Sequence, residues 1–343
     1  MMFVPGSIPR MILSLFLRGS GGESCTAFYY IYQYNMNLKH KNKFGVALKV
    51  TIVFLAAGYI ALRLFGKGNI HFSISRFFSS FEEHPFLFFA VVLLMPINWL
   101  IESMKGKIAA SRSVNISLKE SIKGVLAGVT VGTATPNRIG EFAGKIFMVR
   151  EGDRMQLLLL SFIPSFAQVL VTVVAGAIGF MLHPEVAGLS NSEMFFLLTG
   201  TILVFILPFV PGIIPLRWAT KMEALRTFPR KLFFQIIVLS ILRYSIYVFQ
   251  FLLVLMLTGA NLEWKMALVC ISVSYFIVTM IPTFSFTEVL LRGGIAGFVF
   301  SNGGAEFDLA FTAAVTLWTI NVAVPSLIGS VFVFRLKFLA KEK

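Results

Sequence analysis

Of the ionisable residues inside the long apolar segments of this sequence, three are the first candidates for chemistry. Arg243 is near the middle of segment 232–258. Glu288 and Arg292 are four residues apart in segment 283–300, so a helix would place them on one face, where they can pair. A charge at membrane depth costs free energy, and such residues therefore predict either a functional site or an internal ion pair.

The arginines favour the binding of an anion. A guanidinium binds phosphate through two parallel hydrogen bonds, and the N-terminus of a helix presents backbone N–H groups to the same charge. Two interrupted segments offer helix starts of this kind. One runs from Pro136 through Arg138 to Glu141, and the other runs from Pro282 to Glu288. Paired interrupted helices are typical of substrate sites in transporters.

A second interpretation of Arg243 stays open, in which it forms an internal ion pair with Glu288 or with another carboxylate. Such a pair would hold two helices in register. Loss of Arg243 would then lower the amount of folded protein, whereas loss of an anion site would leave folded protein without activity. Pairing and function are compatible, so both interpretations are kept.

The elements that must position these residues are apolar helices. The chain has 343 residues, of which 57% are apolar and 13% charged, with 37 Phe and a mean hydropathy of +0.82. An ordinary soluble domain has about 45–50% apolar and about 25% charged residues. The composition excludes a water-soluble globule and predicts an all-α, multi-pass bundle of helices in a membrane.

Eight apolar segments are candidates for membrane-spanning helices: 44–65, 86–101, 155–182, 194–215, 232–258, 266–281, 283–300 and 309–334. Short cytoplasmic loops retain Lys and Arg. If both termini lie in the cytoplasm, most Lys and Arg residues fall in cytoplasmic loops, and Lys105 is one of them. The outside loops hold only Arg63, Lys67, Arg76 and Lys265.

Residues 124–141 are apolar but too short for a full span, and they contain Gly124, Gly128, Gly132 and Pro136. Because cations flank this stretch on both sides, we interpret it as a re-entrant segment that enters from the cytoplasm and returns. The alternative is a bent helix that packs tightly through its small residues.

Other classes of function lack support in the sequence. The net charge of +14 would suit nucleic acid in a soluble domain, but here membrane topology and anionic lipid explain it, so no nucleic-acid partner is predicted. The four histidines match no metal spacing, and no nucleotide-binding or hydrolase motif occurs. We therefore predict no metal, no cofactor and no catalytic residue.

The N-terminal stretch 1–35 fits poorly with the remainder and lacks the pattern of a signal peptide, whereas Met36 opens a basic lead-in to the first apolar segment. We therefore interpret 1–35 as an extension that arises from a misassigned gene start. The membrane domain would cover 36–338, and 339–343 would form a cytoplasmic tail.

The sequence resembles a known family, the transmembrane region of lysylphosphatidylglycerol synthase, also described as flippase-like. The most specific match is the run Thr135-Pro136-Asn137-Arg138-Ile139-Gly140-Glu141. Further matching positions are Asn98, Trp99, Glu102, Lys105, Lys119, Gly128, Arg243, Tyr244, Gln250, Pro282, Thr283, Glu288, Arg292, Gly293, Trp318, Asn321, Pro325 and Gly329.

The resemblance implies a bacterial cytoplasmic membrane protein that moves lipid. In the full-length enzymes a soluble domain transfers lysine to phosphatidylglycerol, and the membrane region moves the product to the outer leaflet. Because this sequence ends at Lys343, soon after its last apolar segment, the resemblance implies translocation without lysyltransferase activity.

Our leading hypothesis is a translocase for an anionic or aminoacylated phospholipid. The phosphate would lie near Arg138, Arg243 and Arg292. In the empty site, Glu141 and Glu288 would hold these guanidiniums in place. One alternative is a non-transporting membrane subunit, partnered with an enzyme of envelope-lipid or polysaccharide synthesis. Another is a membrane transferase that uses Glu141 or Glu288 as a general base. The predicted head-group site consists of Pro136, Asn137, Arg138, Glu141, Arg243, Glu288 and Arg292.

Overall fold

The computed structural model describes residues 82–335, with gaps at 134, 136–137, 148–153, 189, 191, 194, 197–198, 201–226 and 282–284. All of these residues belong to one compact unit, Ala56–Leu336. The predictions for 1–35, for the first apolar segment 44–65 and for the tail 339–343 lie outside the described residues.

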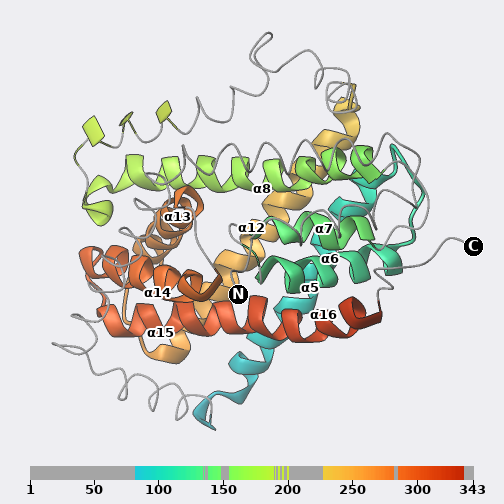
Figure 1. Cartoon of the computed structure of the whole chain (residues 1–343). Coiled ribbons are helices and arrows are strands. Elements are labelled where there is room, and N and C mark those ends of the chain that lie inside the picture. Colours follow the sequence, from blue (N-terminus) through green and yellow to red (C-terminus); the bar gives the residue numbers. More distant parts are fainter. Residues whose placement is uncertain are drawn as a thin grey trace, which may run out of the picture. The chain divides into compact units, whose positions relative to one another are not determined.

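Helices are the only regular secondary structure in the described part of the chain (Figure 1). This confirms the predicted all-α class. The elements in chain order are α5 (Pro85–Ala110), α6 (Leu118–Thr133), α7 (Gly140–Phe147), α8 (Arg154–Leu182), the 3₁₀ turn η2 (Pro184–Ala187), α12 (Arg230–Thr258), α13 (Trp264–Met280), α14 (Ser285–Asn302), α15 (Phe307–Trp318), the π-helical turn η4 (Thr319–Ala323) and α16 (Val324–Arg335).

Within the described residues, four stretches of helix are long and apolar enough to cross a membrane: Pro85–Ala110, Gln156–Leu182, Arg230–Thr258 and Phe307–Val333. Large apolar side chains on these helices point outward, among them Phe86, Met181, Phe234 and Leu327. Apolar surface of this extent is unfavourable in water and suits contact with lipid. Helix lengths and surface thus both fit a membrane protein, whereas the count of eight crossings stays a prediction.

The helix α12 (gold) organises the packing, because it contacts α5 (cyan), α8 and α15 (Figure 1). The C-terminal half of α12 joins the main apolar core, where the Phe251 ring stacks on Phe300 with centroids 5.7 Å apart. Nearby, Phe180 of α8 meets Phe276 of α13 edge-on at 5.4 Å. The core therefore ties α8, α12, α13 and α14 together.

The segment 124–141 forms the end of α6, a turn and the start of α7, and the two helices pack on each other as a hairpin. Glycines allow this approach. A Cβ at Gly128 would lie 2.6 Å from the carbonyl oxygen of Glu141, and a Cβ at Gly144 would overlap the backbone of Gly128. The structure therefore shows the small-residue packing of our alternative interpretation, but in a hairpin rather than in one bent helix. Entry of this hairpin into the membrane from one side stays a prediction.

Candidate functional site

Two arginines and two glutamates from three parts of the chain form one cluster of ion pairs, named here the Glu288 cluster. Arg138 lies in the turn between α6 and α7, and its Nη2 is 2.6 Å from Glu141 Oε1 of α7. Its Nη1 is 3.4 Å from Glu288 Oε1 of α14. Arg292, one turn further along α14, places Nη2 at 2.8 Å and Nε at 2.9 Å from the same oxygen. The predicted pairing of Glu288 with Arg292 is confirmed, and the formal charges of the four residues cancel.

The backbone of the hairpin turn presents Arg138 to the cluster. Arg138 has a φ of 55°, and it alone among the described non-glycine residues has a positive φ. The turn is held by Thr135, whose carbonyl accepts the Arg138 N–H at 3.2 Å and whose Oγ1 accepts the Gly140 N–H at 2.8 Å. Unfavourable φ values of this kind persist where surrounding contacts impose them, often at functional sites.

A cavity of about 50 Å³ adjoins the Glu288 cluster and offers space for several water-sized groups. Arg138 and Arg292 form part of its wall, and the remainder comes mainly from α12, α13 and the α15–η4 segment. Five of its lining residues carry a buried polar atom that makes no hydrogen bond with the described residues: Arg138 Nε, Ser274 Oγ, Tyr275 Oη, Trp318 Nε1 and Asn321 Oδ1. Because native proteins satisfy nearly all buried polar atoms, such a group of atoms indicates a place for a polar ligand or water.

A second polar cluster, named here the Lys105 cluster, joins α5, α8 and α12. Lys105 has no exposed side-chain surface, and its Nζ lies 2.9 Å from Glu102 Oε2. The same Nζ donates to Gln168 Oε1 at 3.0 Å and to Ser240 Oγ at 3.3 Å. The interpretation of Lys105 as a loop cation is therefore wrong. The helix α5 continues past the predicted end of segment 86–101 to Ala110, because Glu102 and Lys105 find polar partners inside the bundle.

Arg243 belongs to the Lys105 cluster. Its Nη1 is 3.3 Å from Glu102 Oε2, and its Nε donates to Asn98 Oδ1 at 2.7 Å. The guanidinium also lies 5.5 Å from the ring centroids of both Trp99 and Tyr247, a distance suited to cation–π attraction. Arg243 thus forms the internal ion pair of our second interpretation, but the carboxylate is Glu102 and not Glu288.

Buried hydrogen bonds of Asn321 tie the wall of the cavity to α5 and α12. Pro325 has no N–H, so the carbonyl four residues earlier, that of Asn321, is released from the helical pattern. This carbonyl accepts the indole N–H of Trp99 at 3.1 Å. The side-chain amide of Asn321, which lines the cavity, donates to Gln250 at 2.8 Å. The π-helical turn therefore holds a cavity residue against α5 and α12.

Of the seven predicted head-group residues, four meet in the Glu288 cluster, Arg243 lies in the Lys105 cluster, and Pro136 and Asn137 lie outside the described residues. Sequence reasoning did not assign a site role to Glu102, Lys105 or Tyr275. The sequence did contain a signal for a polar face on α5, because Asn98, Glu102 and Lys105 follow the i, i+4, i+7 spacing of one helix face.

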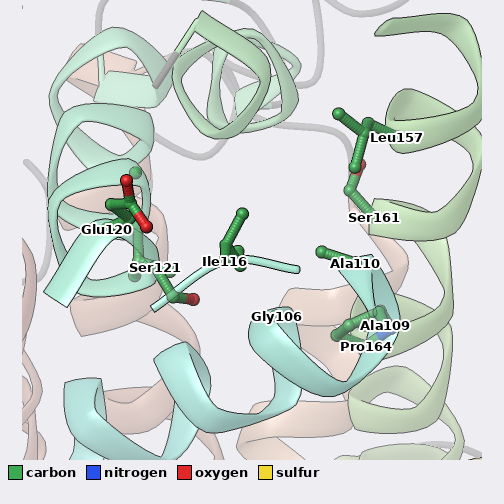
Figure 2. Close-up of a pocket in the computed structure, with 11 residues that line it drawn as sticks. Gly106, Ala109, Ala110, Ile116, Glu120, Ser121, Leu157, Ser161 and Pro164 are labelled. Atoms are coloured by element: carbon green, nitrogen blue, oxygen red, sulfur yellow. The ribbon is translucent and has the colours of Figure 1, made fainter. Parts of the chain in front are cut away.

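A further cavity, of about 40 Å³, lies between α5, α6 and α8. Figure 2 shows Ser121 and Glu120 on one side and Leu157 and Ser161 on the other, with Gly106, Ala109 and Ala110 along α5. The polar groups near it are engaged with the protein: Ser121 Oγ donates to the Ser103 carbonyl at 2.6 Å, and Glu120 Oε2 accepts from Ser117 at 2.7 Å. Its chemistry is therefore less suited to a charged ligand than that of the cavity at the Glu288 cluster.

Comparison of the chain with models of known protein families and with curated proteins found no match.

Proposed function

We propose that this protein is a lipid translocase that moves an anionic or aminoacylated phospholipid between the leaflets of a bacterial cytoplasmic membrane. The observation that carries the proposal is the cavity at the Glu288 cluster, which brings two arginines together with several unpartnered hydrogen-bond donors. The resemblance of the sequence to the flippase-like transmembrane region of lysylphosphatidylglycerol synthase supports the same function.

A lipid phosphate suits the donors around this cavity. Arg138 and Arg292 provide positive charge. The hydroxyls of Ser274 and Tyr275 and the indole N–H of Trp318 make no hydrogen bond with the described residues and can donate one to a phosphate. Charge-assisted hydrogen bonds from guanidinium groups are the strongest that a phosphate receives from side chains. In the empty site, Glu141 and Glu288 hold the arginines in position.

The ion pairs also suit a substrate that must leave again. A phosphate that enters replaces one set of charge-assisted contacts by another, so binding gains little net free energy and the lipid is released readily. This sequence has no nucleotide-binding motif, so we propose movement that is downhill or coupled to an ion gradient or the membrane potential, worth about 2.3 kcal/mol per charge per 100 mV. The proposed topology is multi-pass with both termini in the cytoplasm.

Leaflet exchange in proteoliposomes tests the proposal. We expect exchange of labelled phosphatidylglycerol or its lysyl ester to exceed that of a zwitterionic lipid. Arg292→Gln is expected to lower this selective exchange at least tenfold, since it removes a charge-assisted contact worth about 1.5–3 kcal/mol. Arg230→Gln is the matched control, because Arg230 is exposed at the start of α12, and it should exchange lipid like the unmodified protein.

Two outcomes would count against the proposal. Equal exchange by the Arg292 and Arg230 variants would show that lipid movement does not depend on the Glu288 cluster. No exchange of any lipid by folded protein, with or without an imposed potential, would favour the alternative of a non-transporting membrane subunit and direct the search to co-purifying enzymes.

A further inference from the structure

The Glu288 carboxylate is bound through only one of its two oxygens. Oε1 accepts all of its contacts with the guanidiniums, from Arg292 at 2.8 and 2.9 Å and from Arg138 at 3.4 Å. Oε2 is buried and makes no hydrogen bond with the described residues. The side chain is 2% exposed, so the second oxygen is shielded from bulk water. The carboxylate therefore depends on two arginines for its negative charge.

A phosphate at this site would compete for the same two arginines. A buried carboxylate without a counter-charge is strongly disfavoured, and such a group is neutralised by taking up a proton. The unpartnered Oε2 is the atom that would carry this proton, because Oε1 faces the guanidiniums.

No other group around Glu288 in the described residues replaces the lost positive charge. Glu141 on α7 is itself negative, and Tyr247 on α12 and Tyr275 on α13 are neutral. Arg243 on α12 is occupied by Glu102. The helix α15, which packs along α14, contributes the apolar side chains Phe311 and Val315 beside Gly293.

We propose that Glu288 takes up one proton when a phosphodiester head group binds to Arg138 and Arg292, so that an anionic lipid and a proton move together. The inference rests on the proposed function and deepens it. On the side where the lipid enters, a hydronium ion gives up a proton and becomes water, and an O–H bond forms at Glu288 Oε2. On the other side this bond breaks and the proton passes to a water molecule, when the lipid leaves and the arginines return to the carboxylate. No electrons are transferred, and a singly charged lipid with one proton crosses without net charge.

Titration calorimetry of the full chain in detergent tests the coupling, with dihexanoyl phosphatidylglycerol as the probe. Repeating the titration in buffers of different ionisation enthalpy measures the protons taken up with each bound lipid. We expect about one proton, and affinity that falls about tenfold per pH unit above neutrality, since one bound proton is linked to binding.

Variants assign the proton to its residue. Glu288→Gln should bind the probe without proton uptake and with affinity independent of pH. The matched control is Glu185→Gln, because Glu185 is exposed beside His183 and does not line the cavity, and it should keep the uptake of the unmodified protein. Uptake that persists in Glu288→Gln but disappears in Glu141→Gln would overturn the assignment to Glu288.

The outcomes separate this inference from the proposed function. Binding of the probe without proton uptake overturns the coupling alone and leaves the lipid site intact. Absence of binding by folded protein across pH 5–9 overturns both. The proton count on the unmodified protein decides the matter even if Glu288→Gln does not fold.

Discussion

Glu102→Gln is expected to destabilise the protein by about 3–5 kcal/mol, because it leaves buried cations beside a group that no longer carries charge. Glu102 Oε2 contacts both Lys105 at 2.9 Å and Arg243 at 3.3 Å, and the Lys105 side chain is fully buried. Thermal unfolding in detergent would show the loss as a lower midpoint temperature. Size-exclusion chromatography would show it as a smaller amount of monodisperse protein.

Glu83→Gln is the matched control, since Glu83 is exposed at the start of the described residues, and its midpoint should equal that of the unmodified protein. The double variant Glu102→Gln/Lys105→Met should recover part of the loss, because it removes one of the two cations along with the carboxylate. An unchanged midpoint in Glu102→Gln would show that the Lys105 cluster does not stabilise the bundle and would restore Arg243 as a candidate for the head-group site.

Gly144→Ala is the second substitution with a large expected effect. A Cβ at Gly144 would overlap the backbone of Gly128 and Ala127, and backbone cannot move aside as a flexible side chain can. The helices α6 and α7 would have to separate, which displaces Glu141 and Arg138 from the Glu288 cluster. We expect a loss of stability of about 3 kcal/mol, at the upper end of the range for overpacked sites, together with loss of selective lipid exchange.

Gly200→Ala provides the matched control for this substitution. Apart from the adjacent backbone, no atom of the described residues lies within 4 Å of a Cβ at Gly200, so alanine meets no obstacle from them, and stability should be unchanged or slightly higher. If Gly144→Ala unfolds at the same temperature as Gly200→Ala and retains lipid exchange, close packing of the hairpin is not needed for the site.

The positions of most helices could be predicted from the sequence, because the length of an apolar segment is a local property. The predicted segments 155–182 and 232–258 agree with α8 and α12 to within two residues at each end. The predicted segment for α5, 86–101, ends nine residues before the helix does, at Ala110. Glu102 and Lys105 interrupt its apolar run, and their tolerance inside the bundle depends on Gln168 and Ser240, which come from other helices.

The candidate site likewise contains one contact that the sequence predicts and others that it does not. The pairing of Glu288 with Arg292 follows from four-residue spacing on one helix, which the backbone geometry determines by itself. The contact of Arg138 with Glu288 joins residues 150 positions apart, and the partner of Arg243 is Glu102 rather than Glu288. These partners are decided by the packing of α5, α7, α12 and α14, because glycines and ring contacts set how closely the helices approach. The sequence by itself thus determined an apolar helical protein with charged residues at depth, and only the tertiary structure decided which charges meet.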